Sequence, residues 1–320
     1  MKIAYFNPHG DPGEFRTELE RHAGVTFAVA ESEKDLPGAV SGAEILVTGN
    51  RIYTAEPARL IRENADSLRW IAFTTSGFDK AVASGLPAGV CVTNMSGLRS
   101  WAIAEHAIFL MLAAMRRTRK LGEAQSRHHW ARVEMTPEMD YASFRRMLIV
   151  GVGAIGQDIA RKAKAFDMHV TGISRSAGPL SHFDVIRPRA ELAAAAAEAD
   201  VVMVSAVAEN GSFGLISREV LDSMHSSSIL VNIARGSLVD EEALIETLRA
   251  GRIAAAAIDV QAQEPVPPEH PLWDLDNLIL TPHVAGAGPN TEGVTHASVF
   301  AKNLRRWIAG ETLDKVVRQT

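Results

Sequence analysis

The sequence contains a single cysteine, Cys91, among 320 residues. One cysteine cannot form an intrachain disulfide or supply a cysteine cluster for zinc or iron–sulfur, and a reducing cytoplasm fits this usage. Long apolar runs are also lacking, because the longest, Ala107 to Met115, is much shorter than the roughly 18 residues of a membrane span. The apolar stretch Ile3 to Phe6 is too short for the core of a signal peptide. We therefore expect a cytoplasmic protein without a membrane segment.

Blocks of charge of one sign are lacking as well. The 38 acidic residues outnumber the 33 basic ones and leave a net charge of -5, so no polyanion-binding surface is indicated and nucleic acid is not an expected partner. A hydrophobic content of 47% is typical of a globular protein. A chain of 320 residues exceeds what one core usually organises, so we expect about two domains with a cleft between them.

Strand-like runs alternate with helical stretches along most of the chain, which is typical of parallel α/β folds. The predicted strands of a first series are 2–6, 25–30, 45–48, 70–74 and 90–93. Those of a second series are 147–151, 169–173, 201–206, 229–233, 254–258 and 278–280. We predict a substrate domain of residues 1–98 plus 290–320, closed by a returning helix over 291–308, and a dinucleotide-binding domain of residues 99–289.

A helix between the two series should link them. Ser100 is a plausible N-cap, apolar residues follow at helical spacing, and the cations from Arg116 to Lys120 suit the negative end of the helix dipole. The polar residues 123–142 interrupt the alternation and indicate an arm or an interdomain loop. Trp130 in this stretch is interpreted as a packing or subunit contact rather than a substrate contact.

A glycine motif, Gly151-Val152-Gly153-Ala154-Ile155-Gly156, follows a predicted strand and opens a helix. In that context Gly151 permits the turn, Gly153 lets the backbone approach a pyrophosphate, and Gly156 allows close packing of helix on strand. The alternative is a glycine-rich turn without a ligand. The motif favours a dinucleotide site, and it gives the predicted fold class: α/β, with two Rossmann-like or flavodoxin-like domains, parallel sheets and an interdomain active-site cleft.

The next strand ends in Ser174-Arg175-Ser176, where no acid is present. A carboxylate there would bind the ribose hydroxyls and repel a 2′-phosphate, whereas serine and arginine offer donors and positive charge. We therefore predict that NADP is preferred, with NAD possible. The alternative is that Arg175 is a solvated surface residue.

Three segments of the second series carry residues suited to acid–base chemistry on an anion: 232–236, 259–265 and 281–286. Each follows a predicted strand, and ligands bind at the carboxyl ends of parallel strands. Together with the glycine motif, Ala104-Glu105-His106-Ala107 and His270-Pro271-Leu272-Trp273, the chain resembles the D-2-hydroxyacid dehydrogenase family along nearly its whole length.

The resemblance implies reduction or oxidation at C2 of a small 2-oxo or 2-hydroxy acid, without a metal. It implies that Arg235 binds the carboxylate and carbonyl, that Glu264 pairs with the catalytic histidine, and that His283 donates or accepts the proton. Histidine suits this role near neutral pH, a neighbouring carboxylate favours imidazolium, and arginine can grip a 2-oxo carboxylate. Each residue also has a structural alternative: a buried ion pair for Arg235, a cap for Glu264, a core position for His283.

Further residues follow from the resemblance. Those assigned to the cofactor, beside the glycine motif and Ser174 to Ser176, are Ile233, Ala234, Asp259 and Gly286. In the first domain Ser76 and Gly77 resemble a loop whose backbone amides hold the substrate carboxylate, and Asn50-Arg51 could add polar contacts to the cleft. The chain departs from many relatives over residues 205–212, beside the cofactor in that family.

Other activities of the same scaffold stay open, namely phosphite, formate or phosphoglycerate dehydrogenase. The chain ends at Thr320, which counts against the longer phosphoglycerate type. A dinucleotide-sensing, corepressor-like binding protein is the alternative from another class. Relatives form dimers, so a homodimer is expected, with a small 2-oxo or 2-hydroxy acid as the other partner.

Overall fold

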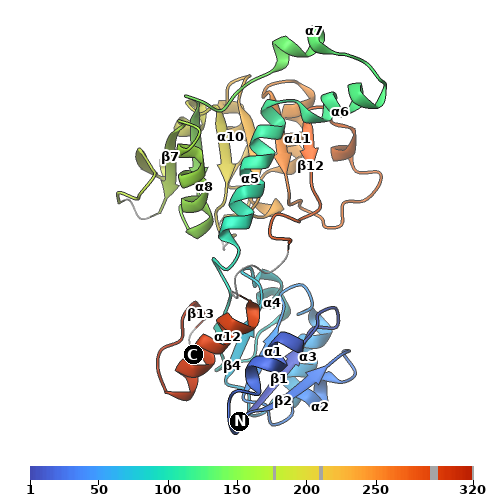
Figure 1. Ribbon diagram of the computed structural model, residues 1–320, viewed down its shortest axis with the longest axis vertical. Helices are drawn as coiled ribbons and strands as arrows, with labels where there is room; N and C mark the ends of the chain where they lie inside the picture. The colour runs from blue at the N-terminus through green and yellow to red at the C-terminus, as the bar shows by residue number, and fades with distance from the viewer. Residues whose placement is uncertain (176–177, 209–211, 289–294, 319–320) are drawn as a thin grey trace. The chain divides into compact units, whose positions relative to one another are not determined.

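The computed structural model describes residues 1–175, 178–208, 212–288 and 295–318 (Figure 1). Ser176, residues 209–211 and the first part of the predicted C-terminal helix, 291–294, lie outside the described residues. The chain divides into two compact units. Unit 1 comprises Met1–Leu98 and Gly288–Thr320, and unit 2 comprises Arg99–Ala287.

Unit 1 is built on a six-stranded sheet with the strand order β13-β5-β4-β3-β1-β2. Its strands are β1 (Lys2–Phe6), β2 (Thr26–Ala30), β3 (Ile45–Thr48), β4 (Trp70–Phe73), β5 (Cys91–Thr93) and β13 (Val316–Arg318). Its helices are α1 (Gly13–Leu19), α2 (Leu36–Val40), α3 (Ala55–Asn64), α4 (Asp79–Ser84) and α12 (His296–Ile308). All neighbouring strands are parallel except β13, which runs antiparallel to β5.

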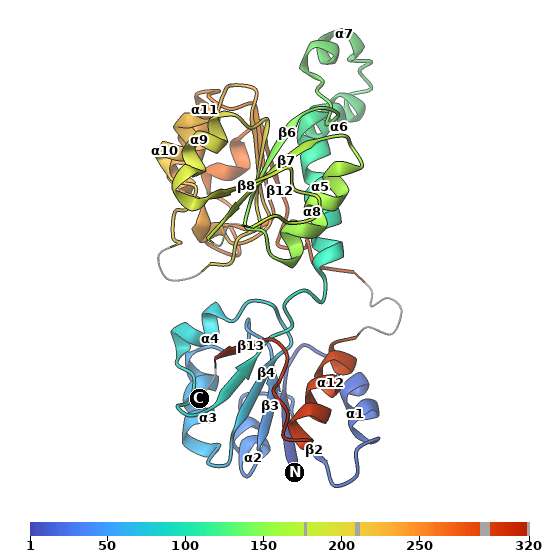
Figure 2. The same ribbon diagram turned by 90° about the vertical axis from the view of Figure 1, so that its left-hand side faces the viewer.

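Both faces of this sheet are covered, which explains why its strands are apolar at successive positions. Ile45 and Val47 of β3 face a cluster that includes α1 and α12, whereas Leu46 faces the cluster of α2 and α3 (Figure 2). Trp70 stacks on Phe300 of α12 with ring centroids 5.2 Å apart. The C-terminal helix is therefore packed into the core of unit 1.

Unit 2 has a seven-stranded, wholly parallel sheet in the order β12-β11-β10-β9-β6-β7-β8. Its strands are β6 (Arg146–Val150), β7 (His169–Ser174), β8 (Val185–Pro188), β9 (Val201–Val204), β10 (Ile229–Asn232), β11 (Ala255–Ile258) and β12 (Leu278–Leu280). Its longer helical elements are α5 (Ser100–Met115), α6 (Thr118–Ser126), α7 (Arg132–Met135), α8 (Ala154–Lys164), α9 (Leu192–Ala197), α10 (Arg218–Ser223) and α11 (Glu241–Arg249). Short 3-10 turns lie at Thr136–Glu138, Arg189–Glu191, Gly236–Leu238 and Pro271–Asp274.

The helices of unit 2 form two layers around the sheet. Figure 2 shows α5 and α8 on one face and α9, α10 and α11 on the other. Alternate residues of β6 divide accordingly, since Met147 and Ile149 pack toward α5 and α8 while Leu148 and Val150 pack toward the opposite layer. This arrangement confirms the predicted α/β class with two parallel-sheet domains.

Several local predictions were wrong. The N-cap of α5 is Arg99, and the Ser100 hydroxyl instead donates to Asp158 Oδ2 at 2.6 Å. The helix ends at Met115. Arg117, with φ +49°, interrupts the helical conformation before α6, so Arg119 and Lys120 belong to a second helix. The strands β8 and β13 were not predicted, because each is short and mixes apolar residues with arginine.

Residues 123–142 are not an irregular interdomain loop. They contain the end of α6, then α7 and a 3-10 turn, all within unit 2, and α6 and α7 project from one end of that unit (Figure 1). Among the described residues, no helix combines the length and apolar character needed to cross a membrane.

Candidate active site

Three loops of unit 2 carry the predicted catalytic residues. Arg235 follows β10, Glu264 follows β11 and His283 follows β12, and these strands are neighbours in the sheet. Since all three strands are parallel, the loops leave the same edge.

The loops are also in direct contact. A β-carbon on Gly236 would lie 2.0 Å from the Gln261 carbonyl carbon, so only glycine lets the β10 loop approach the β11 loop this closely. Gln261 in turn donates from Nε2 to the Thr281 carbonyl at 3.2 Å, which joins the β11 loop to the β12 loop. The structure thus brings the three predicted segments together.

His283 and Glu264 form a hydrogen-bonded pair, with 2.7 Å between Nδ1 and Oε2. Both side chains are about one-third exposed, at 31% and 32%. The Gln261 amide donates to the other Glu264 oxygen at 3.3 Å and so fixes the carboxylate. With Nδ1 turned to Glu264, Nε2 lies on the opposite side of the ring from the carboxylate. This is the geometry of an imidazole oriented for proton transfer by an acid.

The backbone of His283 is left-handed, with φ +54°. Histidine adopts this region more readily than most residues, but it still requires support from its surroundings. That support comes from the residue directly after β11, because the His283 amide donates to the Asp259 carbonyl at 2.8 Å.

Asp259 is fully buried and its carboxylate has several donors. Thr281 Oγ1 donates at 2.6 Å and the Val284 amide at 2.9 Å to Oδ1, and the Ala285 amide donates at 2.8 Å to Oδ2. Burial works against ionisation, but hydrogen bonds from His106, Thr281 and the two amides outweigh it and lower the pKa of Asp259. Asp259 therefore holds the loop after β12, and its direct contact with the cofactor stays a prediction.

The loop of Arg235 is organised by Asn232, which sequence reasoning did not single out. Its side chain accepts from the Ala234 amide at 3.1 Å and donates to the Arg235 carbonyl at 2.9 Å. Arg235 is half-buried, and its Nη1 donates to the Ala234 carbonyl at 2.7 Å. An asparagine that ends a buried strand is the signal that could have identified this role.

The glycine motif has the geometry that a dinucleotide needs. Gly151 has φ +102° and packs against Ala206, since a β-carbon there would lie 2.5 Å from Cα of Ala206. A β-carbon on Gly156 would lie 2.1 Å from the Gly151 carbonyl, so helix and turn are in close contact. Gly153 is the N-cap of α8, and a β-carbon there would meet nothing within 4 Å, which leaves open space for a phosphate.

Other residues assigned to the cofactor surround this turn or the catalytic loops. Ala154 and Ile155 begin α8, Ser174 ends β7, and Arg175 is exposed just after it. Ile233 is buried and Ala234 half-buried in the loop after β10. The Gly286 carbonyl accepts from Arg99 at 3.2 Å, so this residue is tied to the start of α5. Ser205 was missed: its hydroxyl donates to the Gly151 carbonyl at 2.7 Å.

In unit 1, Ser76 and Gly77 lie in the loop after β4. Asn94 donates to the Ser76 carbonyl at 2.6 Å. Asn50, predicted as a possible cleft contact, is buried and accepts from the Ala81 amide at 3.1 Å. Arg51 is exposed in the loop after β3.

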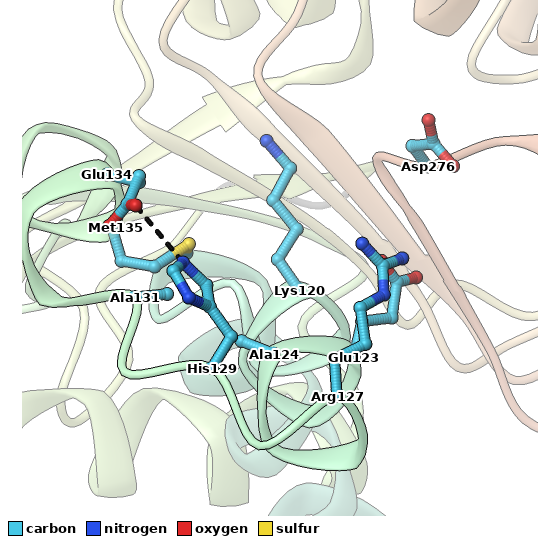
Figure 3. Close-up of a pocket in the computed structure, with 9 residues that line it drawn as sticks. All are labelled: Lys120, Glu123, Ala124, Arg127, His129, Ala131, Glu134, Met135 and Asp276. Carbon is cyan, nitrogen blue, oxygen red and sulfur yellow. Dashed lines mark hydrogen bonds and ion pairs between the residues drawn. The ribbon is translucent and has the colours of Figure 1, made fainter.

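A pocket of about 340 Å³ lies elsewhere, on the arm formed by α6 and α7. Figure 3 shows its lining, in which His129 pairs with Glu134 while Lys120 and Arg127 add positive charge. None of the predicted catalytic or cofactor residues is among its lining residues. Over the described ranges, no group of three or more metal-ligating side chains is assembled.

A parallel sheet of this order, a glycine turn at a helix start and an oriented histidine–acid pair define a nucleotide-dependent oxidoreductase fold. Residues 108–285 match the family model described as "D-isomer specific 2-hydroxyacid dehydrogenase, NAD binding domain". The chain belongs to the D-isomer specific 2-hydroxyacid dehydrogenase family, and it is an oxidoreductase with the NAD-binding domain of that family.

Similar proteins differ in their named activities. The chain is 32% identical to the glyoxylate reductase/hydroxypyruvate reductase of Mus musculus, over 98% of this chain and 96% of that protein. It is 30% identical to a D-3-phosphoglycerate dehydrogenase of Methanocaldococcus jannaschii over 93% of this chain, but spans only 56% of that relative. A solved NADPH-dependent glyoxylate/hydroxypyruvate reductase from Sinorhizobium meliloti superposes with a TM-score of 0.80 at 25% identity, over 99% of this chain and 98% of that one.

Proposed function

We propose that this protein reduces a small 2-oxo acid, such as glyoxylate or hydroxypyruvate, to the 2-hydroxy acid with NADPH. The observation that carries the proposal is the pairing of His283 with Glu264 at 2.7 Å, on a loop joined through Gln261 to the loop of Arg235. A bound reduced nicotinamide supplies the hydride.

The residues of the chain supply the rest. Protonated His283 gives a proton to the oxygen of the substrate carbonyl, which becomes the hydroxyl. Glu264 holds the ring in orientation through its hydrogen bond to Nδ1. Arg235 binds the carboxylate of the substrate and polarises its carbonyl, because a guanidinium offers planar paired donors. In unit 1, we assign the backbone amides of Ser76 and Gly77 and the exposed Arg51 to carboxylate binding.

The preference for NADPH is supported by the end of β7, where Ser174 and Arg175 stand in place of an acid. Replacing Ser174 with Asp and Arg175 with Ala should raise the ratio of kcat/KM for NADH over NADPH. The test measures kcat/KM with NADH and with NADPH for both the wild type and the double variant. An unchanged ratio of the two kcat/KM values would refute the assignment.

The substrate proposal is tested by a turnover screen with NADPH and NADH against glyoxylate, hydroxypyruvate, 3-phosphohydroxypyruvate and pyruvate. We expect glyoxylate or hydroxypyruvate to give the highest kcat/KM. A preference for the phosphorylated acid would instead support the second candidate, a phosphoglycerate dehydrogenase, which the relative from Methanocaldococcus jannaschii favours. Binding of NADPH without turnover of any acid would overturn the proposal and support a dinucleotide-sensing protein.

We also propose that the protein is a homodimer whose arm packs on a second copy. Trp130 and Val133 on the arm are 86% and 84% exposed, and large apolar groups so placed mark association surfaces. Replacing both with serine should convert a dimer into a monomer in light-scattering measurements. A monomeric wild type would refute this proposal.

A further inference from the structure

We propose that His106, on α5, is a positioning residue for His283: through Thr281 and Asp259 it holds the loop after β12 in the conformation that presents the imidazole. The inference rests on the proposed function, in which His283 is the proton donor. It concerns a residue remote in sequence from the three catalytic segments.

The hydrogen bonds that join His106, Thr281 and Asp259 run in a fixed direction. Thr281 Oγ1 lies 2.6 Å from Asp259 Oδ1, and only the hydroxyl can donate between them when the carboxylate is ionised. A hydroxyl has one hydrogen, so the contact of 3.2 Å between His106 Nε2 and Thr281 Oγ1 requires His106 to donate. His106 Nε2 also lies 3.5 Å from Asp259 Oδ1. His106 therefore carries a proton on Nε2 that is directed at this pair.

Thr281 and Asp259 together hold the loop after β12. The Asp259 carboxylate accepts the amides of Val284 and Ala285, and its backbone carbonyl accepts the amide of His283. Three consecutive amides are thus bound by one residue. The left-handed His283 backbone, with φ +54°, lies at the start of that run. A shift of the Asp259 side chain would move the loop that carries the imidazole.

The position of α5 brings His106 to this loop. This helix packs against β10, β11, β12 and α8, and its face toward the sheet is buried. From it His106 reaches Thr281, while Arg99 just before it donates to the Gly286 carbonyl. One helix therefore contacts both ends of the segment 281–286. Asp259 is fully buried and the His106 side chain is only 18% exposed. Water therefore replaces the donors His106 and Thr281 poorly.

The experiment compares His106→Leu and Thr281→Val with the wild type. Each removes a donor at similar volume. We expect kcat for 2-oxo acid reduction to fall about 10- to 100-fold, the range that a misplacement of about 1 Å can produce. The Kd for NADPH should change less than kcat, because the glycine turn is untouched. Hydrogen exchange of the segment 281–287 should accelerate in both variants.

Conservative variants separate positioning from general damage. His106→Gln places an amide donor near the position of Nε2, and Thr281→Ser keeps the hydroxyl, so both should recover most of the lost kcat. Glu105→Gln is the matched control on the same helix, since Glu105 is exposed and its carboxylate pairs with Lys162 at 3.3 Å, away from Thr281 and Asp259. The double variant His106→Leu/Thr281→Val should lose less than the product of the two single losses.

The outcomes decide the two proposals separately. Faster exchange of 281–287 with a kcat loss that the Gln and Ser variants recover supports the inference. Unchanged exchange, unchanged kcat, or a loss that neither conservative variant recovers overturns it. If the wild type reduces no acid in the panel, the proposed function fails, and the exchange rates alone decide whether His106 holds the loop.

Discussion

In unit 1 the loop after β4 is held by the amide of Asn94, whereas in unit 2 the loop after β12 is held by the carboxylate of Asp259. Both sit at the carboxyl ends of parallel strands, but the supporting chemistry differs. A neutral amide fixes a loop without adding negative charge, which suits a loop expected to bind a carboxylate. A buried carboxylate binds backbone amides more strongly, and it supports a loop whose histidine adopts a left-handed backbone.

The largest expected effect lies in unit 2. His283→Ala should lower kcat about 10²- to 10⁴-fold, because proton transfer by a positioned side chain contributes that much. Thermal stability should change little, since the side chain is about one-third exposed. Steady-state kinetics and a melting curve check both. The control is His225→Ala, a half-buried histidine whose Nδ1 contacts Ser227 in the same unit. A kcat for His283→Ala near that of the control would contradict the assignment.

The next effect tests the contact between catalytic loops. Gly236→Ala should lower kcat about 100-fold, because the added methyl group must push Gln261 aside by an ångström or more. Gly38→Ala in α2 of unit 1, where a β-carbon meets nothing within 4 Å, should leave kcat unchanged. Equal kinetics of the two variants would show that the loops are not in the described contact.

A smaller effect is expected in unit 1. Asn94→Ala removes the bond of 2.6 Å to the Ser76 carbonyl and should raise KM for the 2-oxo acid about tenfold, with a smaller change in kcat. Asn277→Ala, which loses a comparable bond of 3.1 Å to the Leu248 carbonyl in unit 2, is the matched control. An unchanged KM in Asn94→Ala would remove this loop from substrate binding.

Glu264→Gln sharpens the comparison through the orientation of the imidazole. The carboxylate lies 2.7 Å from His283 Nδ1, and an amide would hold the ring less firmly, so kcat for reduction should fall about 10- to 100-fold. Steady-state kinetics measure this. An unchanged kcat would argue against the role of Glu264.

The smallest effect concerns stability. Hydrogen bonds lower the pKa of Asp259 in the folded protein despite its burial, so the stability it contributes is present above the ordinary aspartate pKa of about 3.9 and is lost as pH falls through the folded value. The difference in melting temperature between the wild type and Asp259→Asn should therefore narrow from pH 6 to pH 3. A difference that grows on acidification would contradict the lowered pKa.

Patterns of period and spacing predicted the strands that are apolar, such as Ile45–Thr48 and Leu278–Leu280. They did not predict β13, which completes the sheet of unit 1 from the far end of the chain. The parallel fold predicted that the three loops follow the carboxyl ends of strands, and the structure brings Glu264 and His283 within 2.7 Å of each other. The support by Ser205 and His106 could not be predicted, because it depends on which carbonyls and carboxylates fold next to each side chain.

The placement of α5 bears on how this chain could be recombined with a relative. A chimaera with its crossover between Leu98 and Arg99 would inherit the helix, Thr281 and Asp259 from the same parent. A crossover one helical turn beyond His106 would take the donor, His106, from one parent and its acceptors, Thr281 and Asp259, from the other. Domain exchange should therefore succeed at the first junction and give well-folded, slow enzymes at the second.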